Sequence, residues 1–156
     1  MILYLDASAL AKRYFNETGS EVVAARFESG EKIFTSLLCF AEVHSAIARK
    51  FREKEFDERE FNRLREAFRE DWLFSLGKLD FDLNSMNALP RLVETYSLKA
   101  GDAIHLSTAF WLRDSLRKGK WRGEAEETVE FGVADNRLAK VALECGFQVF
   151  NPEGEH

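Results

Sequence analysis

The stretch ILYLDASALA, residues 2–11, begins the chain with four apolar residues that end at Asp6. A short apolar run that stops at a charged residue, followed by helix-favouring residues, predicts a buried strand and then a helix, here from Ala7 to roughly Phe15. The same alternation continues along the chain. Further strands are predicted at 32–35, 128–133 and 147–150, and further helices at 20–28, 37–53, 57–72, 101–116 and 136–145.

Strands that alternate with helices pair in parallel through right-handed crossovers. The pattern therefore predicts an α/β fold, a three-layer α/β/α sandwich around a parallel central sheet of four or five strands. Two segments interrupt the alternation. The region 79–96 is predicted to be helical in its second part, where Pro90 starts or kinks a helix, and 117–127 is predicted to be an exposed loop.

Length and charge limit the class of protein. The 156 residues suit one compact domain, predicted to span residues 1–156. The net charge of -5 argues against a protein that coats nucleic acid, because that affinity comes from basic residues that face phosphates. It does not exclude an enzyme that acts on RNA, since bound cations offset the charge of metal-ligating carboxylates.

The sequence predicts a cytoplasmic protein without a membrane partner. Asp6 comes too early for the apolar core of a secretory signal, and no segment approaches the roughly 20 apolar residues of a membrane helix. Cys39 and Cys145 lie far apart, and neither has the nearby cysteine or histidine companions of a zinc site. We expect two buried thiols in a reducing compartment.

Four acidic residues are predicted to meet at one end of the molecule. In an open parallel sheet, ligands gather at the carboxyl ends of the strands. Asp6 directly follows the first strand, and Asp135 lies two residues beyond Val133. Glu42 lies about one and a half turns into the helix after the second strand, and Asp102 lies at the start of its helix.

The aspartates each have a simpler explanation, because each could merely cap the helix that follows it. Glu42 is harder to explain in this way. It lies mid-helix within the largely apolar run 37–47, where a carboxylate without a partner is costly or takes up a proton. A bound cation removes that cost. Four carboxylates without adjacent basic residues suit Mg²⁺ or Mn²⁺, and such a site suits phosphodiester hydrolysis.

Four short segments contain these acids in order along the chain. They are LDASALAK (5–12), AEV (41–43), LKAGDAIHLSTA (98–109) and VADNRL (133–138), the last followed by GFQV (146–149). Together they resemble the motifs of PIN domains, especially those of the VapC-type toxins of bacterial and archaeal toxin–antitoxin pairs. The third segment is the most diagnostic, and the four are spread along nearly the whole chain.

The resemblance implies that the metal ligands and catalytic acids are Asp6, Glu42, Asp102 and Asp135, bound to Mg²⁺ or Mn²⁺, and that Ser8 supports Asp6. It also implies an endoribonuclease that cuts single-stranded or loop RNA to leave 5′-phosphate and 3′-hydroxyl ends. A cognate antitoxin protein and a homodimer are expected by the same resemblance.

The last motif departs from the family's pattern at one position. Val133 stands where the family often has Thr or Ser, two residues before the final acid. A hydroxyl there could orient ligands or water. Asn136 could supply a replacement polar group.

Four basic residues near the motifs are candidates for holding RNA phosphates at the rim of the site: Lys12, Arg13, Arg49 and Arg113. Each could equally be a solvated surface residue. His105 lies one helical turn from Asp102, which would suit a general base. A histidine packed on the core side is the simpler interpretation, because metal ions would already generate the nucleophile.

An apolar stripe at helical spacing is formed by Phe61, Leu64, Phe68 and Trp72. Such a stripe usually packs into its own domain. In a VapC-like protein, an apolar groove in this part of the chain would receive an amphipathic segment of the antitoxin.

Other interpretations stay open. One is a catalytically silent PIN-like binding module, and another is a PIN nuclease that processes RNA and is not a toxin. An aspartyl-phosphate phosphatase would need a second acid at the position of Ser8, and a receiver domain would need an acidic pair at the end of the first strand. The sequence has neither. No glycine-rich phosphate loop follows that strand, which disfavours a nucleotide-driven enzyme.

Overall fold

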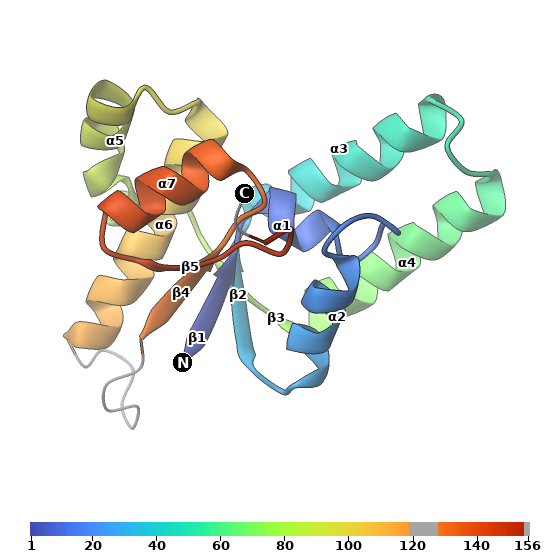
Figure 1. Ribbon diagram of the computed structural model, residues 1–156, viewed down its shortest axis with the longest axis horizontal. Helices are drawn as coiled ribbons and strands as arrows, with labels where there is room; N and C mark the ends of the chain where they lie inside the picture. The colour runs from blue at the N-terminus through green and yellow to red at the C-terminus, as the bar shows by residue number, and fades with distance from the viewer. Residues whose placement is uncertain (119–127, 155–156) are drawn as a thin grey trace.

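The computed structural model of the protein describes residues 1–118 and 128–154. Its centre is a parallel sheet of five strands in the order β3-β2-β1-β4-β5. The strands are β1 Ile2–Leu5, β2 Lys32–Ser36, β3 Leu76–Leu79, β4 Val129–Gly132 and β5 Gln148–Phe150. Because every neighbouring pair is parallel, the carboxyl ends of the strands share one edge of the sheet, the upper edge in Figure 1.

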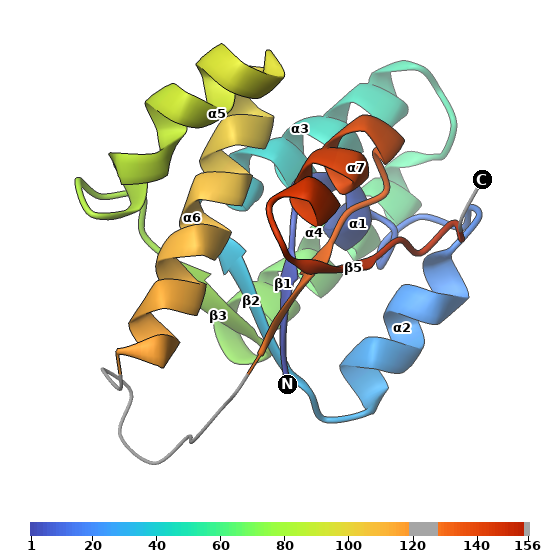
Figure 2. The same ribbon diagram turned by 60° about the vertical axis from the view of Figure 1, so that its left-hand side comes forward.

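Helices cover both faces of this sheet (Figures 1 and 2). One face is covered by α1 Ala7–Ala11, α2 Ser20–Glu28, α3 Leu38–Arg52 and α4 Glu58–Phe74. The other face is covered by the 3-10 helix Ser85–Ala88, α5 Leu89–Tyr96, α6 Ala100–Arg117 and α7 Asn136–Glu144. The predicted three-layer α/β/α sandwich with a parallel sheet is therefore confirmed.

The central strand β1 is buried on both faces. Leu3 and Leu5 pack into the core beneath α1, α3 and α4, whereas Ile2 and Tyr4 pack into the core beneath α6 and α7. A parallel strand covered by helices on both faces is apolar without interruption, as this one is. Asp6 is the first polar residue after it, so its carboxylate emerges where the strand ends and α1 begins.

Two local features of the sequence mark the starts of helices. Asp57 caps the start of α4: its Oδ1 atom accepts a hydrogen bond of 2.8 Å from the backbone N–H of Glu60. Pro90 lies in the first turn of α5, so it starts the helix and does not kink it. A proline is tolerated there because the first backbone N–H groups of a helix have no partner within the helix.

Two elements differ from the sequence prediction. Helix α1 ends at Ala11, because the backbone N–H groups of Lys12, Arg13 and Tyr14 bond three residues back, in the tighter turns that often close a helix. Strand β3 was not predicted. It is a four-residue edge strand containing Gly77, where an added Cβ would lie only 2.5 Å from the ring of Phe34. Its pairing with β2 is a long-range contact that leaves little local signal.

In the described part of the chain, no helix is both long and apolar enough to cross a membrane. Most of the loop predicted at 117–127 falls within residues 119–127 and so lies outside the described residues.

Candidate metal-binding and catalytic site

One groove of about 440 Å³ at the carboxyl edge of the sheet is lined by all four acids that the sequence singled out: Asp6, Glu42, Asp102 and Asp135. They come from the end of β1, the N-terminal part of α3, the first turn of α6 and the segment between β4 and α7. Asp6 and Asp135, which lie near opposite ends of the sequence, therefore face the same space.

Two of these acids also cap helices. Asp6 Oδ1 accepts a hydrogen bond of 2.9 Å from the N–H of Ala9, and Asp135 Oδ1 accepts one of 2.8 Å from the N–H of Leu138. A carboxylate has about four acceptor positions, so capping leaves room for further ligands. Capping and membership of the groove are therefore compatible, and the cap fixes the direction in which each carboxylate points.

Burial and mutual repulsion raise the pKa values of two of these acids. Burial raises the pKa of Asp6 from 3.8 to about 6, although His105, Ala9 and Ser8 partly oppose this shift. Burial and the nearby carboxylate of Asp135 likewise raise the pKa of Asp102. Within the described ranges, no lysine or arginine forms an ion pair with any of the four carboxylates. The groove therefore concentrates negative charge, although Lys99 and His105 partly oppose the rise in the pKa of Asp102.

Ser8 connects Asp6 to the segment that follows β4. Its hydroxyl group lies 2.8 Å from Oδ1 and 2.9 Å from Oδ2 of Asp6, and its oxygen accepts a hydrogen bond of 2.9 Å from the N–H of Ala134. Support of Asp6 by Ser8 was expected from the family resemblance. The contact with the segment after β4 was not foreseen, and it ties the start of α1 to the approach to Asp135.

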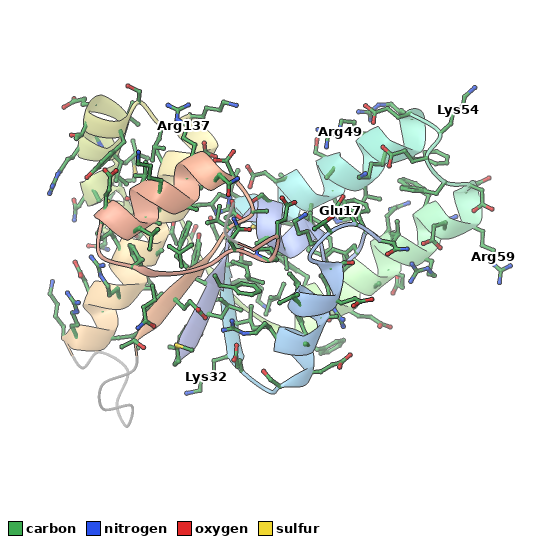
Figure 3. The ribbon with its side chains drawn as sticks, in the orientation of Figure 1. Glu17, Lys32, Arg49, Lys54, Arg59 and Arg137 are labelled. Atoms are coloured by element: carbon green, nitrogen blue, oxygen red, sulfur yellow. The ribbon has the colours of Figure 1, made fainter. Side chains whose placement is uncertain are left out.

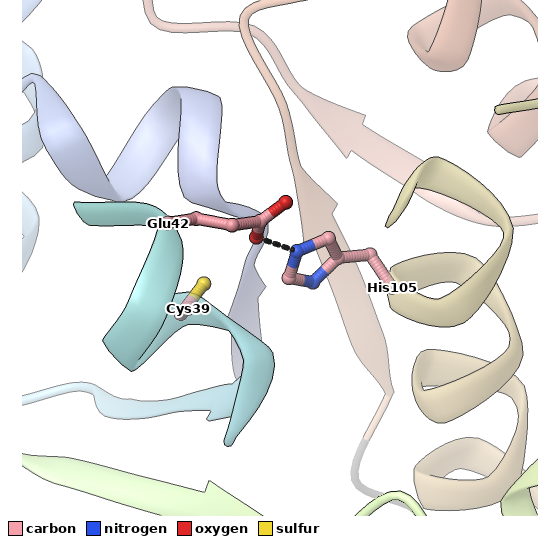
Figure 4. A group of neighbouring side chains, drawn as sticks. All are labelled: Cys39, Glu42 and His105. Atoms are coloured by element: carbon pink, nitrogen blue, oxygen red, sulfur yellow. Dashed lines mark hydrogen bonds and ion pairs between the residues drawn. The ribbon is translucent and has the colours of Figure 1, made fainter. Parts of the chain in front are cut away.

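His105 also lines the groove, and its bond to Glu42 was not predicted. Its Nε2 atom lies 2.6 Å from Oε2 of Glu42 (Figure 4). Its Nδ1 atom lies 3.1 Å from the hydroxyl oxygen of Tyr4. The ring is 2% exposed, which agrees with the simpler interpretation of a histidine on the core side. No local pattern signals its bond to Glu42, because that contact crosses between α6 and α3.

Cys39 lies closer to other ligand-type atoms than the sequence suggested. Ligand atoms of Cys39, Glu42 and His105 all lie within 4.8 Å of one another (Figure 4), so the expectation that Cys39 has no histidine nearby is corrected. Its Sγ atom makes a 2.8 Å hydrogen bond with the hydroxyl group of Thr35, and burial raises the pKa of the thiol. These contacts fit a protonated, buried thiol, as expected, better than a thiolate ligand.

Two basic side chains line the groove. Arg49 is exposed on α3, as predicted for the rim, and points to the same end of the molecule as Arg137 of α7 (Figure 3). Lys50 was not predicted. Its Nζ atom lies 2.7 Å from Oε2 of Glu55 and 4.0 Å from Oε2 of Glu17, which itself lines the groove. The acids are thus bordered by positive charge on the α3 side.

The other three basic candidates do not line the groove. Lys12 is 4% exposed, and its Nζ atom lies 2.5 Å from Oε1 of Glu153. Arg13 points to Asp71, with Nε 3.4 Å from Oδ2. Arg113 lies toward the far end of α6, where it donates a hydrogen bond to a carbonyl oxygen at the end of α7. None of the three lines the groove, because long-range ion pairs and packing direct them elsewhere.

The region around the fourth acid also differs from expectation. The side chain of Val133 is fully buried in the core beneath α6 and α7, so it does not line the groove. Asn136 was expected to supply a replacement polar group. Its Oδ1 atom instead accepts a hydrogen bond of 2.9 Å from Nδ2 of Asn151, and it is not among the residues that line the groove.

The chain is thus an α/β/α sandwich that gathers carboxylates at the carboxyl edge of a parallel sheet. The sequence model of the PIN domain matches residues 3–142. The chain belongs to the PIN domain family. Its relatives include Ribonuclease VapC45 and Ribonuclease VapC49 from two strains of Mycobacterium tuberculosis, CDC 1551 / Oshkosh and ATCC 25618 / H37Rv respectively. Each is 29% identical over 115 residues, which cover 72% of this chain and 78% of the relative.

Solved structures share the fold. FitAcB from Neisseria gonorrhoeae matches with a TM-score of 0.66 and 20% identity over 97% of this chain and 98% of that chain. VapBC2 from Rickettsia felis, solved bound to a DNA fragment from its promoter, matches with a TM-score of 0.60 and 11% identity over the same shares of the two chains. At these identities the likeness concerns the fold alone.

Proposed function

We propose that this chain is a metal-dependent endoribonuclease that hydrolyses RNA phosphodiester bonds, with residues 1–156 forming a single PIN domain. The convergence of four carboxylates in one groove of a PIN-family chain is the observation that carries the proposal. The mycobacterial relatives are both named ribonucleases, which supports the same activity here.

The proposed cofactor is Mg²⁺ or Mn²⁺, and its proposed ligands are Asp6, Glu42, Asp102 and Asp135. The donor atoms fit these ions, because all are carboxylate oxygens. The raised pKa values of Asp6 and Asp102 reflect burial and mutual repulsion, which a divalent cation would relieve. When bound, the ion supplies the charge that polarises a phosphate oxygen and lowers the pKa of an attacking water molecule.

The chain's own side chains have distinct tasks in this proposal. Ser8 and the N–H of Ala9 hold the carboxylate of Asp6 in its ionised form through hydrogen bonds. Arg49 and Lys50 border the groove, so they would bind the phosphates beside the cleaved bond. Lys12, Arg13 and Arg113 have no part in this proposed RNA surface.

A toxin of a toxin–antitoxin pair is the biological role that we propose, with an antitoxin protein and a second copy of this chain as partners. The proposed antitoxin site is a groove between α3 and α4. Phe40 and Leu73, which line it, are 42% and 53% exposed. Arg65 adds positive charge, whereas Arg69 is paired with Glu66, which also lines the groove. These features suit an amphipathic segment that carries acidic residues beside its apolar face.

The apolar stripe on α4 divides between the core and this groove. Leu64 and Phe68 are 2% and 0% exposed and pack into the domain's own core, which is the usual outcome for such a stripe. Trp72 lines the groove. Co-expression with a candidate antitoxin protein tests the partner: a complex should form, and Leu73→Glu should weaken it while leaving RNA cleavage intact. If Leu73→Glu binds the antitoxin with unchanged affinity, this groove is not the antitoxin site.

The test of the activity is cleavage of a structured RNA pool by purified protein with Mg²⁺ or Mn²⁺, with chelator, and beside Asp102→Asn. We expect cleavage that requires metal and is lost in the variant. Asp114→Asn is the matched control, because it makes the same charge change on the exposed side of the same helix, outside the groove. Normal cleavage by a pure preparation of Asp102→Asn would refute the assignment of that acid.

A further inference from the structure

A buried chain of hydrogen bonds connects the central strand to one of the proposed metal ligands. The hydroxyl oxygen of Tyr4 lies 3.1 Å from Nδ1 of His105, and Nε2 of the same ring lies 2.6 Å from Oε2 of Glu42 (Figure 4). Tyr4 and His105 are 0% and 2% exposed. β1, α6 and α3 each contribute one member, so the chain of bonds spans the interior of the molecule.

The direction of these bonds follows from the chemistry of the groups. A phenol is protonated at neutral pH and can donate its proton to Nδ1 of His105. If Nδ1 accepts, the remaining ring proton is on Nε2, which then donates to the carboxylate of Glu42. A separation of 2.6 Å is short and is typical of a hydrogen bond to a charged acceptor.

This arrangement restricts how Glu42 can present its oxygens. The side chain of Glu42 is 34% exposed and would otherwise sample several rotamers. His105 holds Oε2, while Oε1 lies on the side of Gly101, where an added Cβ would be 3.1 Å away. One oxygen is therefore occupied by the histidine, and the other faces the first turn of α6, which carries Asp102.

Resting on the proposed function, we propose that His105 is a positioning residue: its Nε2–H group fixes the carboxylate of Glu42 in the orientation that binds the divalent ion, and Tyr4 fixes the tautomer of His105. Hydrogen-bond partners behind a metal ligand commonly orient it in this way. The role differs from that of a general base. Both ring nitrogens are engaged and the ring is buried, so it has no free nitrogen to offer an attacking water molecule.

Mn²⁺ binding, measured by calorimetry on the purified full chain, tests the inference apart from catalysis. His105→Leu removes both hydrogen bonds and should weaken Mn²⁺ binding by about 10- to 100-fold. His105→Gln keeps an N–H donor at a similar distance from the backbone and should recover much of that loss. Melting temperatures of the same samples show whether each variant is folded.

Tyr4→Phe is the second variant, because it leaves His105 in place and frees its tautomer. We expect Mn²⁺ affinity to fall by roughly 3- to 10-fold, the range of one lost hydrogen bond. Tyr14→Phe is the matched control. It too removes a buried hydroxyl, which in this case donates to the carboxylate of Asp71 at 3.1 Å, outside the groove. Equal affinities in the two variants would overturn the role of Tyr4.

The outcomes separate the inference from the proposed function. Wild-type protein that binds Mn²⁺, with a folded His105→Leu variant that binds it equally well, would overturn the positioning role and leave the metal site standing. Loss of turnover with unchanged Mn²⁺ affinity would instead make His105 a proton-transfer residue. Wild-type protein that binds no Mn²⁺ would overturn the proposed function and this inference together.

Discussion

The hydroxyl group of Ser8 bonds to both carboxylate oxygens of Asp6, at 2.8 and 2.9 Å. These bonds stabilise the ionised carboxylate and so oppose the rise in its pKa that burial causes. Ser8→Ala should therefore raise the pKa of Asp6 further. We expect the acidic limb of the pH profile of kcat/KM, measured with Mg²⁺ between about pH 5 and 8, to move to higher pH.

The variant should also lose some stability, because the N–H of Ala134 loses its acceptor. A loss of about 1 kcal/mol is expected for one hydrogen bond of this kind. Ser29→Ala provides the control, since its hydroxyl donates to a backbone carbonyl oxygen in an exposed turn far along α2. An acidic limb that stays in place in Ser8→Ala would show that Ser8 does not tune Asp6.

The pKa of Asp6 predicts how the stability of the metal-free protein depends on pH. Its pKa is about 6 in the folded state against 3.8 for the ordinary group, so the folded protein binds the proton more tightly. The stability that this proton contributes is complete below about pH 3.8 and is lost as the pH rises through about 6.

Between pH 5 and 7 this single group should lower the free energy of unfolding by about 1.4 kcal/mol. Urea denaturation in chelator, on wild-type protein and on Asp6→Asn, isolates the effect, because other titrating groups are common to both. The difference in stability between the two proteins should grow toward pH 7, with the variant the more stable. Parallel pH dependences would contradict the raised pKa.

Gly101 lies beside Glu42, so a substitution there should change stability and metal binding in opposite directions. A Cβ at this position would lie 3.1 Å from Oε1 of Glu42, closer than an undisturbed contact. Gly101→Ala should favour helix α6 by up to about 1 kcal/mol, since alanine restricts the unfolded chain more than glycine does. It should also displace the carboxylate of Glu42, so we expect weaker Mn²⁺ binding in a protein that melts no earlier than wild type.

Ala100→Gly is the control for this pair of effects. It lowers the helix propensity of the same turn, which Gly101→Ala raises, and it adds no atom near Glu42. We expect a lower melting temperature with unchanged Mn²⁺ affinity. If Gly101→Ala binds Mn²⁺ as tightly as the wild type, the space beside Oε1 has no role in the site.

The position of the four acids could be predicted because it depends on local signals. Apolar runs identify strands β1 and β4, and parallel strands place the residues that follow them at one edge of the sheet. Asp6 and Asp135 are fixed by this rule alone. Glu42 and Asp102 follow because each lies near the start of a helix that begins at the same edge.

The features that were missed all depend on contacts between distant segments. His105 and Glu42 are 63 residues apart, and their bond requires α6 and α3 to meet across the end of the sheet. Lys12 seemed a rim residue, but its partner Glu153 lies 141 residues away, near the C-terminus. Single-sequence patterns carry no information about such pairs, because periodicity describes only the face on which a residue lies.

Binding of the metal should appear as thermal stabilisation that depends on Asp102. A ligand that binds only the folded state stabilises it by about 2.7 kcal/mol at 100 times its dissociation constant, which for a chain of this size is a rise in melting temperature of roughly 5 to 10 °C. Wild-type protein and Asp114→Asn should both show this rise with Mg²⁺ or Mn²⁺. Asp102→Asn should lose most of it, because Asp102 lines the groove and Asp114 does not. The same rise in all three proteins would place the ion outside this cluster.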